Sequence, residues 1–240
     1  MATFVLIHGA CHGGWCWRKV TSLLRAAGHN VYAPTLTGLG ERIDQATPEV
    51  GLDTHVQDVL NVLEYEDLTS VVLVGHSYGG LVIAGVAEYA SERLAHLVYL
   101  DAIVADDGQA LVDQISPEAR ASMEERVRTG GDGWRRPIDI ESTLDSYGID
   151  DPTERRWMTE RLVPHPWKTF TDPLRIPSGR GQLLPRTFIL CTRRSTPSHG
   201  ANRARSEPGW KYREIDTAHD AMVTAPRELT DLLLEAAQSG

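Results

Sequence analysis

The sequence predicts an α/β protein with a mostly parallel sheet, helices on both faces and a helical cap insertion. The strand-like segments 4–7, 71–74 and 97–100 are apolar at nearly every position, without the alternation of a half-exposed strand. Helix-like segments separate them along the chain. Strands that are buried on both faces and joined through helices are typical of a parallel sheet covered on both sides.

The first half of the chain alternates strand and helix in a regular order. The predicted elements are a strand over 4–7, a helix over 16–27 ended by Gly28, a strand over 30–33 closed by Pro34, a helix capped by Asp53 or Thr54, the strand over 71–74 with its helix over 81–87, and the strand over 97–100. The helix capped by Asp53 or Thr54 has one apolar face, formed by Val56, Val59, Leu60 and Leu63.

This order stops between about 105 and 185, where charge, proline and glycine are more frequent. Helix-like pieces over 111–127 and 153–163 and three tryptophans argue against a disordered linker. Strands over 187–191 and 210–215 then resume the pattern, and a last helix starts near Thr224 and Pro226. We therefore expect a core of residues 1–104 and 186–240, with 105–185 as a cap over the carboxyl edge of the sheet, where ligands bind in such folds.

Composition and charge narrow the functional classes. The chain has 240 residues with 41% hydrophobic and 24% charged residues, which is ordinary for a globular protein. A net charge of −9 argues against a nucleic-acid surface. No apolar run approaches the roughly 20 residues of a membrane span, and no export signal is visible, so a cytoplasmic location is expected. Cys11, Cys16 and Cys191 lack metal-ligand spacing, so we expect reduced thiols and no metal. The sequence leaves open whether the protein forms a homodimer.

One motif points to nucleophilic chemistry. The apolar run 71–74 leads directly into Gly-His-Ser-Tyr-Gly-Gly at 75–80, and a second apolar stretch follows. A strand that turns sharply into a helix exposes a serine hydroxyl at the turn, and glycines two residues away let the backbone close. The pattern predicts Ser77 as a nucleophile, with a plain glycine turn as the structural alternative.

A serine hydroxyl needs a base, and in this strand–turn–helix arrangement the histidine comes late in the chain. His219 lies between the last predicted strand and the last helix, at the carboxyl edge of the sheet. The oxyanion formed by serine attack needs preorganised donors. We expect these to be the backbone amides of Tyr78, which follows the nucleophile, and Ala10, in the glycine-rich loop after the first strand.

These residues resemble the α/β-hydrolases of the plant methylesterase and hydroxynitrile lyase type and their bacterial esterase relatives. The resemblance is carried by the run 4–15, the weaker run 27–31 and the motif at 75–80, and it covers about 3–104 and 186–238. It implies a cap over a buried pocket, no cofactor and serine attack on small esters. It matches Ser77 to the nucleophile, His219 to the base and the amides of Ala10 and Tyr78 to the oxyanion donors.

Two departures from the family pattern matter. The lyase branch typically has threonine where Gly9 stands and lysine where Asp220 stands, so cyanohydrin cleavage is disfavoured. Family members usually place the catalytic aspartate just after the strand matched by 188–191, but this chain has Arg193 and Arg194 there. An arginine cannot accept the imidazole N–H.

Another carboxylate must then orient His219, and Asp101 is the best candidate. It follows the strand over 97–100, next to the serine strand at the same sheet edge. Other α/β-hydrolase branches resemble this in taking the acid from that strand. An aspartate there could instead cap a loop. Asp216 and Asp220 are the alternatives, although both lie very close in sequence to His219.

The sequence therefore predicts a serine hydrolase that cleaves a small aromatic or apolar ester through an acyl-enzyme, with a small-molecule substrate and no cofactor. Trp15, Trp134 and Trp157 are candidate pocket residues, with ordinary packing as their alternative. Arginines in the insertion, among them Arg135 and Arg136, either steer an anion or form a solvated face. Carbamate or amide hydrolysis by the same triad, a cofactor-free dioxygenase, a lyase and a non-catalytic binding protein remain as other functions.

Overall fold

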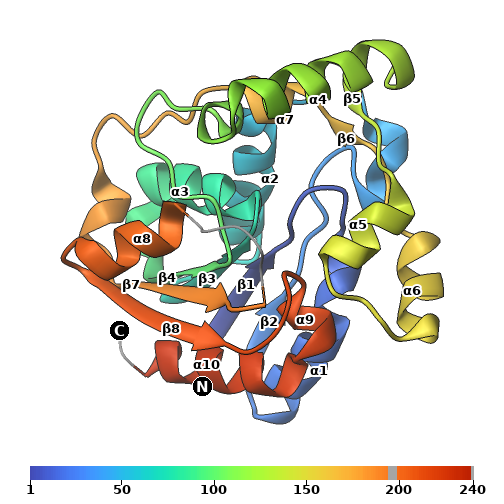
Figure 1. Cartoon of the computed structure of the whole chain (residues 1–240). Coiled ribbons are helices and arrows are strands. Elements are labelled where there is room, and N and C mark those ends of the chain that lie inside the picture. The colour runs from blue at the N-terminus through green and yellow to red at the C-terminus, as the bar shows by residue number, and fades with distance from the viewer. Residues whose placement is uncertain (194–198, 239–240) are drawn as a thin grey trace.

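The computed structural model describes residues 1–193 and 199–238, and these contain a six-stranded parallel sheet (Figure 1). Its strands are β1 (Thr3–Ile7), β2 (Asn30–Tyr32), β3 (Val71–His76), β4 (Leu94–Leu100), β7 (Arg186–Cys191) and β8 (Trp210–Ile215). They lie in the order β2-β1-β3-β4-β7-β8, and every neighbouring pair is parallel. The predicted sheet is confirmed, and all six of its strands run the same way.

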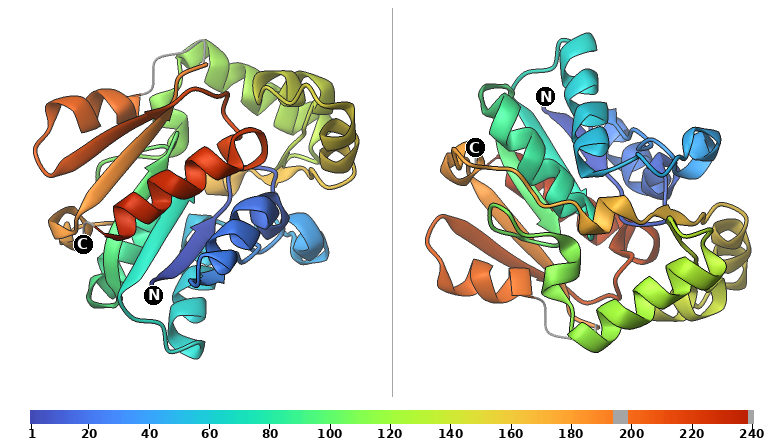
Figure 2. Two further views of the ribbon diagram at one scale, coloured as in Figure 1. Left: turned by 90° about the horizontal axis from the view of Figure 1, so that it is seen from below. Right: turned by 90° about the horizontal axis from the view of Figure 1, so that it is seen from above.

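Helices cover both faces of the sheet. Figure 2 shows α1 (Arg18–Ala26) and α10 (Pro226–Ala237) beside each other below it, with the short α9 (Ala221–Thr224) next to them. On the other face, α2 (Leu52–Tyr65) packs against α3 (Gly79–Ala90), and α8 (His199–Ser206) lies over β7 and β8. Each face has its own apolar core.

Strand β1 shows why the strands are apolar throughout. Phe4 and Leu6 point into the core with α1 and α10, whereas Val5 and Ile7 point into the core with α2 and α3. All four side chains are fully buried. Since successive residues of a strand face opposite sides, a sheet covered twice needs apolar residues at both sets of positions.

The start of α2 differs from the sequence prediction. The helix begins at Leu52 after Gly51, so the expected cap at Asp53 or Thr54 is wrong. The Leu52 amide donates to the carboxylate of Asp172, and the Gly51 amide donates to Thr54 Oγ1. The cap of Leu52 thus comes from a residue 120 positions away, which local sequence patterns do not reveal.

Residues 105–185 contain a series of mostly short elements, most of which lie beyond the carboxyl ends of the strands (Figure 1), although the last one packs beside α3 and leads to the start of β7. These are η4 (Leu111–Gln114), α4 (Pro117–Gly130), β5 (Arg135–Arg136), α5 (Ile140–Ser146), α6 (Pro152–Thr159), β6 (His165–Pro166), α7 (Lys168–Thr171) and η5 (Arg180–Leu183). The helix expected over 111–127 is split, because Ser116 accepts from the Ala119 amide and Pro117 starts a new helix. The antiparallel pair β5–β6 was not predicted.

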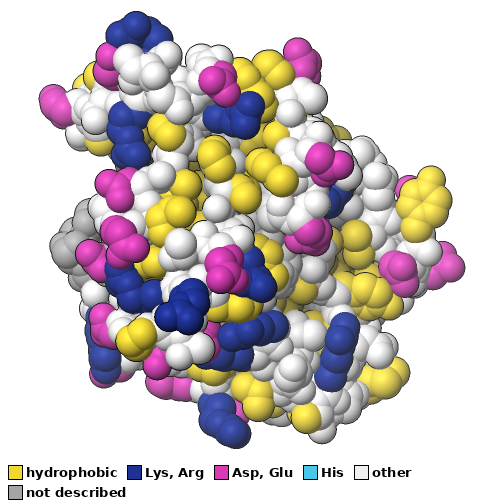
Figure 3. Space-filling view, turned by 90° about the vertical axis from the view of Figure 1, so that its right-hand side faces the viewer, with side chains coloured by type: hydrophobic (Ala, Val, Ile, Leu, Met, Phe, Trp, Pro, Cys, Tyr) yellow, Lys and Arg dark blue, Asp and Glu magenta, His cyan; other side chains and the backbone are white. Residues whose placement is uncertain are grey.

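Three further short 3₁₀ turns join the main elements: η1 (Gly14–Trp17), η2 (Gly40–Gln45) and η3 (Ser91–Arg93). Acidic and basic side chains are interspersed with apolar ones on the face that carries α5 and α6 (Figure 3). Within residues 1–193 and 199–238, no helix combines the length and apolar character that a membrane crossing needs.

Candidate active site

Ser77 stands at a strained turn between β3 and α3. Its φ is +53°, a left-handed conformation that is uncommon for a residue other than glycine. The Ser77 amide donates to the Leu100 carbonyl at 3.1 Å, and its carbonyl accepts from the Ile103 amide at 2.9 Å. Hydrogen bonds to the end of β4 therefore hold the turn in place. The Ser77 side chain remains partly exposed between buried neighbours.

The glycines around Ser77 are required by close backbone approach. A Cβ at Gly75 would come within 2.5 Å of the Gly79 carbonyl oxygen. A Cβ at Gly79 would lie 3.0 Å from the carbonyl oxygens of both Ile7 and His8. Side chains at these positions would push the helix start away from β1 and open the turn, so the spacing of the motif has a steric cause.

Asp101 and His219 meet at the carboxyl edge of the sheet. Asp101 directly follows β4, is only 2% exposed, and is anchored by its amide to the Ile189 carbonyl at 2.8 Å. Its Oδ2 lies 2.6 Å from Nδ1 of His219, which is in the loop after β8. A carboxylate only accepts, so Nδ1 carries the proton and Nε2 of the neutral ring keeps its lone pair. An imidazole in this state can act as a base.

The other two candidate carboxylates have different partners. Asp216 is exposed and forms an ion pair with Arg193, with two contacts of 3.0 Å. Asp220 is fully buried and contacts Nε2 of His12 at 2.9 Å. Of the three aspartates considered from the sequence, Asp101 is the one that the structure hydrogen-bonds to the His219 ring. Arg194 lies outside the described residues.

The loop after β1 presents the Ala10 amide to the same edge. Nδ1 of His8 donates to the Gly9 carbonyl at 2.8 Å, and Nε2 accepts from the Leu36 amide at 3.1 Å. Burial lowers the pKa of His8 to about 3, so this ring is neutral. Because the Gly9 carbonyl and the Ala10 amide belong to one peptide unit, His8 fixes the direction of that N–H.

The amides of Ala10 and Tyr78 are both left without an acceptor among the residues that the structure describes. Backbone N–H groups at a buried site normally have a hydrogen-bond partner. Two open donors near the serine turn are what an oxyanion requires. The Tyr78 side chain points elsewhere, since its hydroxyl bonds to Nδ1 of His55 at 2.9 Å inside the core.

The three candidate pocket tryptophans lie in different surroundings. Trp15 stacks on His12 with ring centroids 5.3 Å apart, which places it near the site. Trp157 contacts Trp15 edge-on at 5.0 Å but also lies under the Arg18 guanidinium at 3.6 Å. Trp134 lies under Arg135. The ring contacts of these three tryptophans do not include Ser77, and a role in the pocket stays a prediction.

Sequence reasoning missed one residue of the insertion near the site, Tyr147, and did not single out another, Arg136, from the other arginines. The ring of Tyr147, just after α5, lies 5.5 Å from that of His219 and 5.4 Å from that of His12. Arg136 donates to Cys11 Sγ at 3.3 Å and has no carboxylate partner within the described ranges, whereas Arg135 pairs with Asp132. Tyr147 lies in no recognisable pattern, and only the fold distinguishes Arg136 from the neighbouring arginines.

One group of side chains among the described residues brings possible metal-binding atoms together. Donor atoms of His76, His219 and Asp220 lie within 4.8 Å of one another, but each of these side chains already contacts protein atoms.

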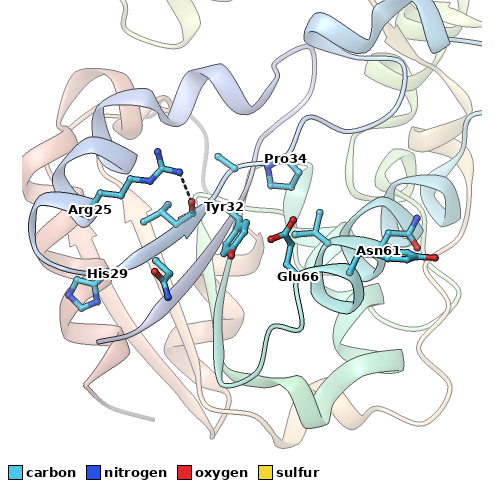
Figure 4. Close-up of a pocket in the computed structure, with 11 residues that line it drawn as sticks. Arg25, His29, Tyr32, Pro34, Asn61 and Glu66 are labelled. Carbon is cyan, nitrogen blue, oxygen red and sulfur yellow. Dashed lines mark hydrogen bonds between the residues drawn. The ribbon is translucent and has the colours of Figure 1, made fainter.

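A groove of about 790 Å³ runs along the outer edge of β2 (Figure 4), between Arg25 and Tyr32 on one side and Asn61 and Glu66 on the other. Its lining does not include Ser77, Asp101 or His219.

Comparison with known proteins agrees with this fold. The sequence model of the alpha/beta hydrolase family matches residues 4–232. The chain is 38% identical over 243 residues to a carbendazim hydrolyzing esterase of Nocardioides sp. (strain SG-4G), covering 97% of this chain and 98% of that one. It is 27% identical over 258 residues to the rice esterase PIR7B (Oryza sativa subsp. japonica), covering 98% and 95%.

Among solved structures, an extracellular alpha/beta-hydrolase from a Paenibacillus species superposes with a TM-score of 0.86 at 23% identity, covering 98% of this chain and 99% of that one. The chain therefore belongs to the α/β-hydrolase family. Relatives that match nearly its whole length include esterases.

Proposed function

We propose that the protein is a serine esterase that cleaves small aromatic or apolar esters through an acyl-enzyme. The contact between His219 Nδ1 and Asp101 Oδ2 at 2.6 Å carries this proposal, because it leaves Nε2 as a base at the edge where Ser77 stands. The open amides of Ala10 and Tyr78 and the esterase relatives support it. We also propose residues 105–185 as the cap that shapes the pocket.

In the proposed mechanism, the Ser77 hydroxyl oxygen attacks the acyl carbon and His219 Nε2 takes its proton. The carbonyl oxygen becomes an oxyanion, which the Ala10 and Tyr78 amides stabilise. His219 returns the proton to the alkoxy oxygen, the alcohol leaves, and the acyl group stays on Ser77. Water then attacks with its proton passing to His219, and the acid is released as the proton returns to Ser77.

Carbamate hydrolysis is the second candidate. The relative at 38% identity is named for hydrolysing carbendazim, which is a methyl carbamate. A carbamate passes through the same tetrahedral intermediate, so the same residues serve both substrates. A panel of aryl and alkyl esters, methyl carbamates and amides, measured as kcat/KM, separates the two activities.

A fluorophosphonate tests the nucleophile directly, because it reacts with a serine only when a base activates it. We expect one equivalent on the peptide that contains Ser77, no label in Ser77→Ala, and kcat of Ser77→Ala and His219→Ala lowered by several orders of magnitude. Ser70→Ala is a matched control, since Ser70 has the same φ of +53° and precedes the same strand but is exposed. Full activity in Ser77→Ala would refute the proposal, and oxygen consumption by that variant would favour the dioxygenase.

A further inference from the structure

Next to the candidate triad lies a second histidine–aspartate pair. Nε2 of His12 is 2.9 Å from Oδ2 of Asp220, and both side chains are almost completely buried. Nδ1 of His12 is 2.8 Å from the Ala10 carbonyl. The carbonyl can only accept, so Nδ1 carries a proton, and the proton between Nε2 and the carboxylate is a second one. An imidazolium facing a carboxylate satisfies both ring nitrogens.

The electrostatic surroundings favour this charged form. Burial opposes a positive charge on His12, but the Asp220 carboxylate and the Ala10 carbonyl outweigh it and raise the pKa of the ring. Burial also opposes the negative charge of Asp220, yet His12 holds the pKa of that carboxyl below its usual value. The two shifts agree in direction, as expected for an ion pair.

The pair joins the two loops on which the proposed chemistry depends. His12 and Ala10 are in the loop after β1, which offers the oxyanion amide, and Asp220 directly follows His219. The His219 carbonyl is held in addition by Nε2 of His76 at 3.0 Å, and His76 precedes Ser77. The His219–Asp220 segment is therefore fixed at its carbonyl from the serine strand and at its side chain from the oxyanion loop.

Ala10 is fixed on both of its peptide units. His8 holds the carbonyl of the Gly9–Ala10 peptide, as described above. His12 holds the carbonyl of the next peptide, and the Cys11 amide of that unit donates to Nδ1 of His165 at 3.0 Å. Cys11 has a φ of +67°, so this backbone is in a conformation that needs such support.

We propose that the buried His12–Asp220 ion pair is a positioning device. It holds the Ala10 amide and the His219 ring at the relative position that the same oxyanion intermediate requires. This inference rests on the proposed esterase function and names two positioning residues for it. A buried ion pair contributes little to stability compared with a well-packed apolar contact, because both charges lose their hydration. The ion pair does fix the position of the two loops relative to each other, since it forms only when both loops lie at the correct distance and orientation.

Asp220→Asn removes the carboxylate charge with little change in side-chain volume, and His12→Asn removes the imidazolium with a smaller polar side chain. A misplacement of about 1 Å at a catalytic group costs roughly 100-fold in rate. We expect kcat to fall by about 10- to 100-fold in each variant with KM changed less than about threefold, and no further fall in the double variant, because both residues act as one unit. Inhibition by a trifluoromethyl ketone, which forms an oxyanion on the enzyme, weakens in parallel with kcat. Asp216→Asn is the control, since that carboxylate is on the same loop but exposed and paired with Arg193.

The wild-type protein offers a measurement that needs no variant to fold. In the ¹⁵N-histidine spectrum at pH 7 we expect both ring nitrogens of His12 to be protonated; a neutral His12 ring overturns the proposal. Near-native kcat in folded Asp220→Asn or His12→Asn also overturns it, as does a fully additive double variant. If Ser77→Ala and His219→Ala are inactive while these variants are active, only the positioning role fails. If Ser77→Ala is active, the esterase function fails first.

Discussion

Asparagine at position 101 is the most direct perturbation of the proposed triad. Asp101→Asn keeps the shape of the side chain and removes its charge, at a position that is 2% exposed and in contact with His219 Nδ1 at 2.6 Å. The amide group can also present its NH₂ to Nδ1, which then has to accept and leaves the proton on Nε2. In that tautomer His219 cannot take the proton of Ser77.

The size of the effect follows from the charge that forms in the transition state. When His219 takes the proton, the imidazolium lies next to the Asp101 carboxylate. Two unit charges about 4 Å apart attract by about 4 kcal/mol at an effective dielectric constant of 20. Since about 1.4 kcal/mol is a factor of ten in rate, the charge alone gives roughly 10³-fold. The wrong tautomer adds to this, and we expect kcat to fall by roughly 10³- to 10⁴-fold.

Steady-state hydrolysis of a p-nitrophenyl ester measures this loss, with near-UV circular dichroism to show that the variant is folded. KM is expected to change little, because Asp101 lies behind the His219 ring. Asp216→Asn is the control and keeps wild-type kcat, since its carboxylate bonds to Arg193 on the surface. An Asp101→Asn enzyme within tenfold of wild-type kcat would refute the assignment of this residue as the triad acid.

Two further predictions concern the close packing around Gly9 and the neutral buried rings of His8 and His55. Gly9→Ala places a Cβ 2.8 Å from His76 Nδ1 and 3.1 Å from Ser77 Cβ, so we expect kcat to fall more than tenfold. Gly130→Ala is the control and leaves kcat unchanged, because its Cβ meets nothing closer than 3.9 Å. Equal values of kcat in both variants would contradict the steric argument. Burial lowers the pKa of His8 to about 3 and that of His55 to about 4, so between pH 6.5 and 4 the unfolded chain binds protons that the native protein does not. The stability contributed by the two neutral rings is present above pH 6.5 and is lost as the pH falls, at about 1.4 kcal/mol per pH unit for each ring. Urea unfolding at pH 7, 6 and 5 measures this loss. A free energy of unfolding that is the same at all three pH values would contradict the prediction.

The parts of the protein that could be predicted are those that local sequence determines. A buried strand, a glycine-flanked serine and a helix are contiguous over residues 71–87, so the turn at Ser77 needs no distant information. His219 follows from its place after the last strand. Asp101 required an argument by exclusion, because arginine stands where the family usually has the acid, and the structure brings its carboxylate to the His219 ring.

The parts that were missed depend on residues far apart in the chain. His12 and Asp220 are 208 positions apart, and neither has a neighbour in sequence that reveals the pair. Strands β5 and β6 have two residues each, which is too short for any periodicity. Tyr147 reaches the site only because the insertion folds back over the carboxyl edge. Such contacts are products of tertiary packing, and propensity and pattern carry no information about them.

The position of Asp101 has an evolutionary consequence. Ser77 and Asp101 lie at the ends of neighbouring strands within one β3–α3–β4 unit, and the segment 105–185 begins only after both. That segment can therefore be exchanged, shortened or lengthened without altering the spacing of the proposed nucleophile and acid. An enzyme arranged in this way can acquire new substrates by replacement of the proposed cap, and chimaeras with the corresponding segment of relatives offer a practical route to altered selectivity.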